Sequence, residues 1–463
     1  MEILKNFCIG LFFLLLLGGG SSLYAQVTIG ETEVDTHSVV TGLDTPWEIL
    51  WGPDDHIWFT ERYGRVSRLN PETGERQTLL IIDQVHEQGE SGLLGMVLHP
   101  DFQENPYVYL VYNYLSGSAI RERLVRYTYQ DDALTSPRVL MEGIDGNSNH
   151  NGARLVIDSL DRLYFTTGDA GNTAHSQDLN SLNGKILRMN LDGTIPEANP
   201  IQDSYIYTWG HRNPQGLVIS PNGIMYSSEH GPASDDEMNI IEKGRNYGWP
   251  DVMGYCDEAS ETDFCEEYNV KEPIAAWTPT LAVAGTEYYD HQAIPEWSNS
   301  LLMATLKESE LVQLSLSEDG REVTGQQVWF DEWFGRLRDV CVSPDGRVYL
   351  AVSNRDGRGN PQPGDDRIVE FRVSQATSAD RLPEKNNDFR VFPNPVKGRL
   401  WITIPDPMTG GTLRLYNSEG KIILDKNNTR SREILNVQGL TPGIYMLVLE
   451  NQQQRLTRKV ILR

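Results

Sequence analysis

Cysteine is scarce in this chain, with four among 463 residues, and no Cys/His spacing typical of a zinc site occurs. The sequence also lacks the phosphate-cradling motif GxxxxGK(S/T), a GxGxxG motif after a strand, the GxSxG of serine hydrolases and the HExxH of zinc proteases. Nucleotide-dependent, α/β-hydrolase and zinc-protease functions therefore lose their usual support.

Basic residues are also in deficit. The 40 Lys and Arg residues are outnumbered by 65 Asp and Glu residues, which gives a formal net charge of −25. A chain this acidic repels a phosphate backbone, so we expect no nucleic-acid partner. The general effect of the acidity is solubility.

Long apolar runs are missing except near the N-terminus. Residues 9–17 form an apolar stretch about half as long as the ~20 residues that a membrane helix needs. Lys5 precedes this stretch, and Leu23-Tyr24-Ala25 resembles an A-x-A cleavage end. We therefore predict a secretory signal peptide over residues 1–25 and no transmembrane segment in the mature chain.

Export bears on the remaining cysteines. Cys256 and Cys265 share one polar loop, and an oxidising compartment makes a disulfide between them plausible. Cys341 lies in the apolar run Val340-Cys341-Val342, so we expect a buried free thiol there.

A turn followed by an apolar strand recurs along residues 40–372. The clearest of six copies are Pro53-Asp54-Asp55 before residues 57–59 and Pro344-Asp345-Gly346 before residues 348–350. Copies spaced roughly 50–70 residues apart predict a six-bladed β-propeller with about four strands per blade. Unrelated hairpins in a sandwich are the alternative, but a sandwich seldom exceeds ~250 residues as one domain.

The domain plan follows from this all-β pattern. We assign the propeller to residues 26–372 and a polar, aperiodic linker to residues 373–388. Residues 389–463 begin a new series of short strands with turns at Gly420 and Pro442-Gly443, which predicts a small C-terminal β-sandwich.

Two neighbouring loops carry an unusual set of polar side chains: His211, Arg212, Asn213 and Gln215, then His230, Asp235, Asp236 and Glu237. Reversal of the chain does not require such a set, so we predict that both loops contribute to one site. Gly231-Pro232 and the carboxylates after it could supply oxygen ligands for Ca²⁺. An acidic, solvated loop is the alternative.

A single histidine precedes a strand in Asn149-His150-Asn151-Gly152. An imidazole with an unperturbed pKa of about 6.5 suits proton removal near neutrality. A surface histidine with a local hydrogen bond is the alternative reading of this position.

Basic residues stand at turns or strand ends in several places: Arg212, Lys307, Arg336 and Arg338. In Arg336-Leu337-Arg338 the two guanidinium groups point to the same side of a strand, because side chains alternate along it. Such a pair can bind a carboxylate or phosphate bidentately. Surface salt bridges with Asp331, Glu332 or Asp339 are the alternative.

Seven strings in residues 40–372 together resemble the soluble pyrroloquinoline-quinone-dependent sugar dehydrogenases, also called glucose/sorbosone dehydrogenases. They are PWEILWGPDDHIWFTER (46–62), GESGLLGMVLHPDF (89–102), NHNGARL (149–155), NGKILRMNLDGTIPEANP (183–200), GHRNPQGL (210–217), SEHGPASDDEMNIIEKGRNYGWP (228–250) and GRLRDVCVSPDG (335–346). The resemblance implies a six-bladed propeller that oxidises the anomeric carbon of aldoses to lactones, with pyrroloquinoline quinone and Ca²⁺ as cofactors.

The resemblance also implies residue roles. His150 matches the general base, and Arg212, with Asn213 beside it, matches the group that polarises the quinone oxygen. The remaining cofactor positions match Glu90, Asn149, Thr280, Lys307, Arg336 and Arg338. The backbone carbonyls of Gly231 and Pro232 match the ligands of the cofactor-activating Ca²⁺. A second, structural calcium site matches Glu237, Tyr247, Tyr255 and Asp257.

The chain departs from the best-known glucose-oxidising members at several positions. Glu90 replaces a glutamine, Asn149 replaces an aspartate and Ala170 replaces another glutamine, while Ala275 stands where a cofactor-stacking tyrosine is found. The chain is more similar to the broader aldose dehydrogenase branch.

The tail resembles the type IX secretion sorting domain of Bacteroidetes. The matching segments are residues 391–395 (VFPNP), 413–416 (LRLY), 442–445 (PGIY) and the basic, apolar end 458–462. The resemblance implies a secreted or cell-surface protein that meets the type IX secretion machinery. A carbohydrate-binding or adhesive β-sandwich is the alternative.

Taken together, these features predict a secreted dehydrogenase with a sugar substrate and an external electron acceptor such as a cytochrome or a quinone. A non-catalytic propeller that binds carbohydrate or protein is one rival. A calcium-dependent propeller lactonase is the other.

Overall fold

The computed structural model describes residues 25–374, 389–392, 396–405, 408–417, 421–427, 429–451 and 454–462. The chain divides into two compact units, Met1–Ser374 and Gln375–Arg463. Apart from Ala25, the predicted signal peptide lies outside the described residues, and so does the predicted linker beyond Ser374.

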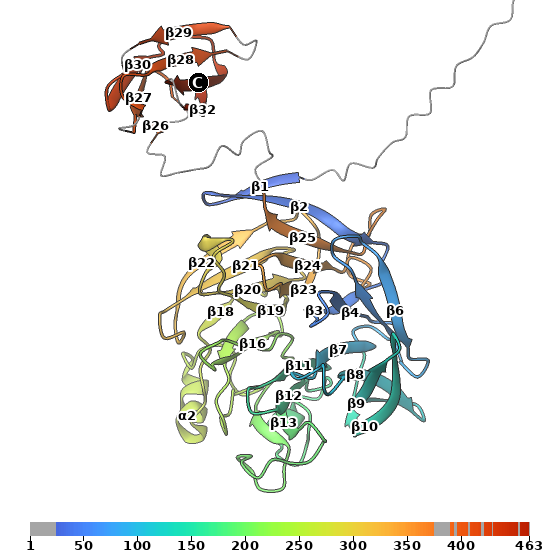
Figure 1. The fold of residues 1–463 in the computed structure, drawn as a ribbon. Coiled ribbons are helices and arrows are strands. Elements are labelled where there is room, and N and C mark those ends of the chain that lie inside the picture. The colour runs from blue at the N-terminus through green and yellow to red at the C-terminus, as the bar shows by residue number, and fades with distance from the viewer. Residues whose placement is uncertain are drawn as a thin grey trace, which may run out of the picture. The chain divides into compact units, whose positions relative to one another are not determined.

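The first unit consists of six antiparallel sheets (Figure 1). The first two sheets contain β3 (Pro46–Trp51), β4 (Ile57–Glu61), β5 (Arg65–Leu69) and β6 (Arg76–Ile81), then β7 (Leu93–Leu98), β8 (Tyr107–Ser116), β9 (Ala119–Gln130) and β10 (Ala133–Asp145). The next two contain β11 (Gly152–Ile157), β12 (Arg162–Thr167), β13 (Lys185–Asn190) and β14 (Ile206–Trp209), then β15 (Val218–Ile219), β16 (Met225–Glu229), β17 (Asp236–Ile240) and β18 (Ala275–Trp277). The fifth contains β19 (Val283–Tyr289), β20 (Ser300–Thr305), β21 (Leu311–Leu316) and β22 (Val323–Trp329).

The sixth sheet closes the ring with strands from both ends of the unit. It contains β23 (Leu337–Val342), β24 (Val348–Val352), β25 (Arg367–Val373), β2 (Thr32–Thr41) and β1 (Ala25–Ile29). The N-terminal strand β2 pairs with β25, with Val34 opposite Val373 and Thr41 opposite Arg367. Hydrogen bonds between the two ends of the unit therefore hold the sheets in a closed ring.

This arrangement confirms the six-bladed propeller. The apolar strand in each of the six sequence copies is the second strand of a sheet, namely β4, β8, β12, β16, β20 and β24. Figure 1 shows β3, β7, β11, β19 and β23 around a common centre. Apolar clusters fill the spaces between successive sheets; one joins Tyr226 and Met238 to Leu301 and Val312.

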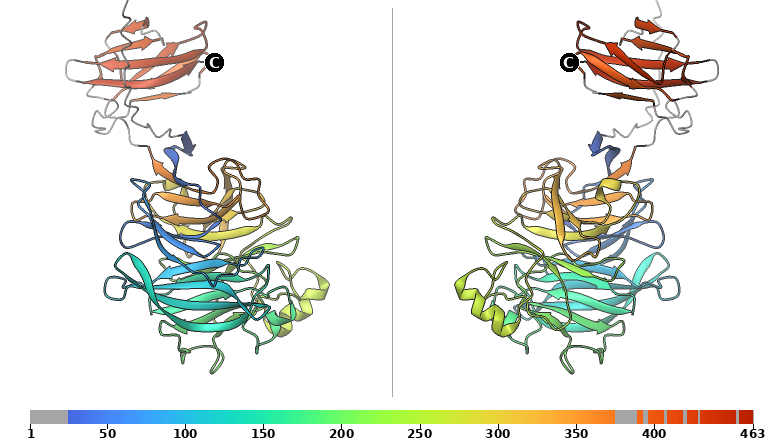
Figure 2. Two further views of the ribbon diagram at one scale, coloured as in Figure 1. Left: turned by 90° about the vertical axis from the view of Figure 1, so that its right-hand side faces the viewer. Right: turned by 90° about the vertical axis from the view of Figure 1, so that its left-hand side faces the viewer.

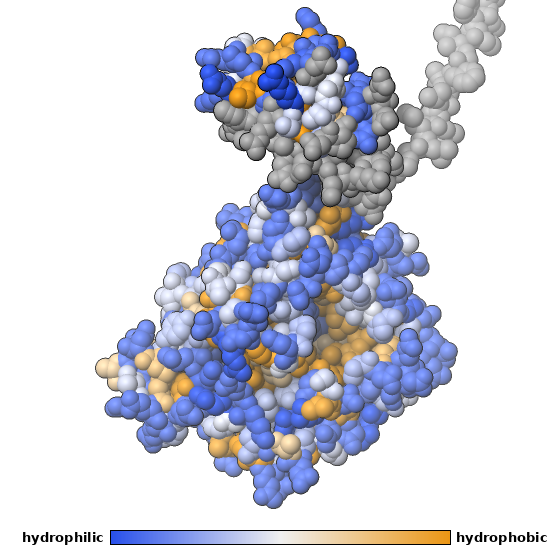
Figure 3. Space-filling view, turned by 60° about the vertical axis from the view of Figure 1, so that its left-hand side comes forward, coloured by the Kyte–Doolittle hydropathy of each residue, from blue (hydrophilic) through white to orange (hydrophobic). Residues whose placement is uncertain are grey.

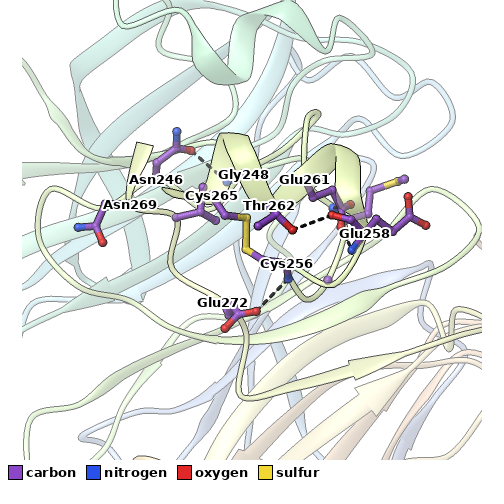
Figure 4. Close-up of a disulfide and its surroundings, with 12 residues drawn as sticks. Asn246, Gly248, Cys256, Glu258, Glu261, Thr262, Cys265, Asn269 and Glu272 are labelled. Carbon is purple, nitrogen blue, oxygen red and sulfur yellow. Dashed lines mark hydrogen bonds between the residues drawn. A yellow bond between two sulfur atoms is a disulfide. The ribbon is translucent and has the colours of Figure 1, made fainter. Parts of the chain in front are cut away.

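Helices are few among the described residues: α1 (Ala174–Gln177), α2 (Ala259–Tyr268) and the 3₁₀ turn η1 (Pro295–Trp297). The Cys256–Cys265 disulfide is present and ties α2 to the loop before it (Figure 4). Figure 2 shows α2 at the periphery of the first unit. Cys341 is buried and free, as predicted. Within the described part of the chain, no helix has the length and apolar character needed to cross a membrane.

The second unit has two sheets, as expected for a small β-sandwich. One contains β26 (Arg390–Phe392), β27 (Arg399–Thr403) and β30 (Arg432–Asn436), and the other contains β29 (Ile422–Lys426), β28 (Thr412–Tyr416), β31 (Gly443–Glu450) and β32 (Arg455–Leu462). Its core draws on both sheets, with Leu400 and Leu435 from the first and Leu415 and Leu447 from the second.

Candidate functional site

His150 is held by an aspartate. The Nδ1 atom of His150 lies 2.8 Å from Oδ1 of Asp169, which is buried. Because a carboxylate only accepts, Nδ1 carries the proton in the neutral ring and Nε2 keeps its lone pair. Burial opposes ionisation of Asp169, but hydrogen bonds from His150, Gly171 and Trp249 lower its pKa below the usual value. His150 is therefore oriented as a proton acceptor.

The loop that carries His150 has an unusual backbone. His150 has φ = 56°, in the left-handed region that a non-glycine residue seldom adopts. A Cβ on Gly168 would meet the His150 carbonyl oxygen at 1.9 Å, so only glycine fits in that position. The strained backbone is a feature found at functional sites.

Arg212 lies on the other side of Asp169. Its carbonyl oxygen accepts a 2.8 Å hydrogen bond from the Asp169 amide, and its guanidinium lies 5.4 Å from the ring of Trp249. Trp249 in turn donates from Nε1 to Asp169 Oδ2 at 3.0 Å. His150 and Arg212 are thus brought together at Asp169, since His150 contacts its carboxylate and Arg212 contacts its backbone amide. The predicted meeting of the two polar loops is confirmed, because Arg212 Nη1 donates to the His230 carbonyl at 2.8 Å.

Not every polar residue of those loops belongs to the site. His211 is fully buried between Glu229, at 2.8 Å, and the ring of Tyr247, at 4.6 Å. Asp236 is fully buried as well and accepts from the amide of Gly231 at 2.8 Å. We expected both side chains to face the shared site. Instead, each forms hydrogen bonds with buried groups inside the fold.

A cavity of about 180 Å³, here called the arginine cavity, lies beside the His150 loop. It contains four arginines and two carboxylates, and its lining residues are Arg62, Gly89, Glu90, Asn213, Gln215, His230, Ala282, Leu306, Arg336, Arg338, Asp356, Gly357 and Arg358. Glu90 Oε2 accepts from the His150 amide at 3.2 Å, which joins the cavity to the base. The cavity is locally positive in a strongly acidic chain.

Arg336 and Arg338 point to the same side, as predicted, and share Asp356. Arg336 Nε lies 2.7 Å and Arg338 Nη2 lies 3.7 Å from Asp356 Oδ2. The surface salt bridges considered above are absent from both, because Arg338 is buried and neither pairs with Asp331, Glu332 or Asp339 among the ion pairs of the described residues. Burial lowers the pKa of Arg338 to about 10. Its buried Nε has no hydrogen-bond partner within the described part of the chain.

These observations test whether an anionic quinone fits. The carboxylates near such a buried guanidinium do not fully offset its burial, which is why its pKa is depressed and an N–H stays without a partner. Arg212 repeats the pattern, since its Nε is buried without a partner and burial lowers its pKa. The side chains therefore fit the carboxylates and carbonyls of pyrroloquinoline quinone.

Other predicted cofactor positions lie around this cavity. Asn213 lines it, and its Oδ1 accepts from the Gly152 amide at 3.1 Å. Thr280 is buried and accepts from Lys307 Nζ at 2.6 Å. Lys307 does not line the arginine cavity but an adjoining groove, and Asn149 is half-buried next to His150 outside the cavity.

The predicted calcium ligands surround a second, smaller hollow of about 10 Å³. Its lining includes Gly231, Pro232, Glu237 and Tyr247, together with Arg212. Burial, followed by the neighbouring Glu229, raises the pKa of Glu237 to about 8. In the described residues, no group of three or more His, Cys, Asp or Glu side chains could hold a metal ion. A cation here would therefore depend on backbone carbonyls, which Ca²⁺ accepts as ligands.

The second predicted calcium set is spread more widely. Glu237 is buried and accepts from the amide of Gly254 at 2.8 Å, while the hydroxyl of Tyr247 donates to the Ile240 carbonyl at 2.7 Å. Tyr255 is exposed, and its carbonyl accepts from the Asp257 amide at 2.9 Å. Tyr255 and Asp257 do not line the hollow.

Several site residues were missed by sequence reasoning: Arg62, Asp169, Glu229, Trp249, Asp356 and Arg358. Asp169 directly precedes Ala170, a position that was considered only as a departure from the family. The signal for Asp356 is weaker, because it lies in the loop between β24 and β25, 18 and 20 residues after its arginine partners at the start of β23.

Comparison with known proteins decides the family. The glucose/sorbosone dehydrogenase model matches residues 43–360, and the secretion system C-terminal sorting domain matches residues 390–463. The chain belongs to the glucose/sorbosone dehydrogenase family. It is therefore a β-propeller oxidoreductase, and its sorting domain indicates export.

Individual relatives agree. The chain is 33% identical to quinoprotein glucose dehydrogenase B of Acinetobacter calcoaceticus, over 72% of this chain and 88% of that protein. It is 30% identical to the aldose sugar dehydrogenase YliI of Escherichia coli, over 68% and 89%. The solved PQQ-bound aldose sugar dehydrogenase of Streptomyces coelicolor is 33% identical, with a TM-score of 0.64 over 74% of this chain and 98% of that one.

Proposed function

We propose that this enzyme oxidises the anomeric carbon of aldose sugars to lactones, with pyrroloquinoline quinone in the arginine cavity and Ca²⁺ beside Gly231 and Pro232. The observation that carries the proposal is the pairing of an oriented base, His150, with two guanidinium groups, Arg212 and Arg338, whose buried Nε atoms have no hydrogen-bond partner among the described residues. When bound, the quinone would accept a hydride and Ca²⁺ would polarise its carbonyl.

The protein's own groups have separate tasks in this reaction. His150 Nε2 takes the proton of the sugar's C1 hydroxyl while hydride leaves C1, and the C1–O bond becomes the lactone carbonyl. Asp169 stabilises the imidazolium that results, because it holds the Nδ1 proton at 2.8 Å. Arg338, Arg336 and Lys307 would hold the carboxylates of the cofactor, and Arg212 would stabilise negative charge on its oxygen. An external cytochrome or quinone then takes the electrons.

Reconstitution tests the proposal. Adding both pyrroloquinoline quinone and Ca²⁺ to apoprotein should produce sugar-dependent dye reduction, and omission of either should abolish it. Hydrolysis of lactones without quinone would instead support a lactonase. Sugar binding without turnover would support a non-catalytic propeller.

His150→Gln gives the sharper test of mechanism. We expect turnover to fall by about 10²–10⁴-fold, the usual contribution of a positioned base. Quinone affinity should stay within about twofold, which separates loss of the base from loss of the cofactor. Unchanged turnover would remove His150 from the mechanism.

We also propose that the signal peptide exports the chain and that the sorting domain directs it through the type IX secretion machinery to the cell surface or the medium. The match of residues 390–463 to a secretion sorting domain supports this route. Deletion of residues 389–463 should leave the protein in the periplasm, as measured by fractionation.

A further inference from the structure

We propose that the surface around α2 is the docking surface for a small, positively charged one-electron carrier such as a c-type cytochrome. This surface, here called the α2 surface, consists of Met253, Tyr255 and residues 258–272. The inference rests on the proposed function, because it names the partner that takes the electrons from the same site.

The α2 surface is continuous with the wall of the candidate calcium site. Met253 lines the small hollow together with Arg212 and Trp249, and its side chain is also exposed at the outer surface. Glu261, in the first turn of α2, is buried, and its Oε1 accepts a hydrogen bond from the Met253 amide at 3.1 Å. A partner bound at α2 would therefore contact the segment that forms the wall of the site.

Several links within the segment give the α2 surface a fixed shape. The Cys256–Cys265 disulfide joins α2 to the loop before it, and the Cys256 amide donates to Glu272 at 2.9 Å (Figure 4). Glu258 and Glu261 form a reciprocal capping box at the start of α2. A surface that is already ordered loses less conformational entropy when a partner binds.

Large apolar and aromatic side chains are grouped on the α2 surface. Met253 is 39% exposed, Tyr255 is 41% exposed and Tyr268 is 49% exposed. The ring of the half-buried Phe264 lies 4.4 Å from that of Tyr268, one turn further along α2. Figure 3, which turns the side of the first unit that carries α2 toward the viewer, shows mainly hydrophilic residues. Exposed aromatic residues grouped in this way are typical of an interaction surface.

The charge of the α2 surface selects the kind of partner. Residues 258–272 contain six carboxylates and one lysine, and their net charge of −5 is a fifth of the −25 of the whole chain. The lysine, Lys271, pairs with Glu242, which lies outside this segment. The exposed carboxylates form no ion pair within the described part of the chain; they are Glu258, Asp263, Glu266, Glu267 and Glu272. Such a surface attracts a basic protein and repels an acidic one.

The electron balance of the reaction also fits a carrier of this kind. Oxidation of one sugar to its lactone releases two electrons and two protons. A haem iron accepts one electron as Fe(III) becomes Fe(II), so two cytochromes must bind in turn while the two protons pass to water. Exposed charges around a small apolar centre suit such a transient complex, because electrostatic attraction raises the association rate more than the affinity.

Binding is tested first without turnover. Oxidised cytochrome c, a small basic haem protein, is titrated by calorimetry into the full-length, quinone-free protein. We expect binding that weakens at least tenfold from about 20 to about 200 mM salt. The triple variant Asp263→Asn, Glu266→Gln, Glu267→Gln neutralises neighbouring carboxylates on α2 and should weaken binding about tenfold at low salt.

A matched triple variant controls for net charge. Glu104→Gln, Asp131→Asn, Glu318→Gln neutralises three exposed carboxylates in turns outside the α2 surface, and it should change the affinity by less than about twofold. Tyr268→Ala tests the apolar part of the surface. It should weaken binding about threefold at both salt concentrations, because it removes a contact that does not depend on charge.

A kinetic readout follows reconstitution with quinone and Ca²⁺. Sugar-dependent reduction is measured with cytochrome c and, separately, with a small dye. The α2 triple variant should lower the second-order rate constant for cytochrome reduction about tenfold. Dye reduction should stay unchanged, because a small dye reaches the site without docking on α2.

Three results would overturn the docking surface: no binding of cytochrome c, equal weakening by the α2 and control triples, or an equal fall of cytochrome and dye reduction in the α2 triple. Sugar-dependent dye reduction without cytochrome binding would thus reject the docking surface and keep the dehydrogenase. Cytochrome binding that depends on α2, with no reduction of dye or cytochrome by sugars, would keep the docking surface and reject the dehydrogenase.

Discussion

Arg154 and Arg338 are two buried arginines with opposite surroundings. Arg154, on β11, is 3% exposed and lies 2.5 Å from Glu48 and 3.0 Å from Asp339. Arg338, on β23, is 5% exposed, and its one ion pair among the described residues is with Asp356, at 3.7 Å, which it shares with Arg336. Burial lowers the pKa of both, but Asp339 and Glu48 reverse the effect at Arg154 and raise its pKa. At Arg338 the pKa falls to about 10.

The two residues are also neighbours through one glutamine. Arg154 Nε donates to the Gln215 carbonyl at 2.9 Å, and Arg338 Nη1 donates to its side-chain oxygen at 3.3 Å. The two arginines are therefore buried to a similar extent and differ in how many carboxylates lie close to them. A cation whose charge is satisfied within the fold stabilises the fold, whereas one left short of anions is available to bind an anionic ligand.

The largest expected effect is on stability at Arg154. Arg154→Met leaves Asp339 buried without its cation and removes the hydrogen bond to Glu48, which should cost about 3–5 kcal/mol of unfolding free energy. Urea denaturation of the propeller measures it. Arg138→Met, at an exposed arginine, serves as the control and should stay within about 0.5 kcal/mol. A small loss of unfolding free energy in Arg154→Met would contradict the view that Arg154 mainly stabilises the fold.

Arg338→Met should have the opposite effect: a small loss of stability and a large loss of affinity for the quinone. Because Asp356 keeps Arg336 at 2.7 Å, the unfolding free energy should change by less than about 1 kcal/mol. Affinity for pyrroloquinoline quinone should fall about 10–100-fold, the value of one or more charge-assisted hydrogen bonds. Equilibrium titration measures the affinity, and an unchanged value would remove Arg338 from the cofactor site.

The central carboxylates should give stability a pH dependence. Burial raises the pKa of Glu48 from an ordinary value of 4.5 to about 8. Between these values the unfolded chain has released the proton and the folded protein keeps it, so the unfolding free energy falls as pH rises, by up to about 1.4 kcal/mol per pH unit. Glu48→Gln should flatten this slope in denaturation curves from pH 5 to 8. An unaltered slope would mean that Glu48 is ionised in the fold.

The smallest expected effect comes from making the two arginines alike. Gln215→Glu places a carboxylate next to Arg338. Arg154 already has two carboxylates next to it, those of Glu48 and Asp339. Quinone affinity should fall about fivefold, or ~1 kcal/mol, because part of the positive charge is then neutralised internally. Gln215→Leu removes the amide without adding charge and should weaken binding less. Equal effects of both variants would show that charge is not the cause.

Much of the fold could be predicted from the sequence. Each of the six turn-and-strand copies marks the second strand of a sheet. They could be recognised because a turn and a strand rich in β-branched or aromatic residues are local features of the sequence. Closure by β2 and β25 could not be predicted in this way. Their partners, such as Val34 and Val373, lie at opposite ends of the unit, and pairing at such separation leaves no periodic signal.

For the site, too, local features could be predicted from the sequence and long-range contacts could not. The side-by-side direction of Arg336 and Arg338 follows from strand alternation and could be predicted. The roles of Asp169 and Asp356 depend on contacts between loops of different strands, so spacing does not reveal them. His211 and Asp236 look as polar as Arg212 in the sequence, and only burial shows that the fold uses them internally.

The most direct test of the account is the crystal structure of the protein reconstituted with pyrroloquinoline quinone and Ca²⁺. We predict that the quinone's carboxylates lie against Arg336 and Arg338, with the ring carbonyls between Arg212 and His150. A saturated complex in which the quinone lies elsewhere, leaving Arg338 Nε without an anionic partner, would contradict it.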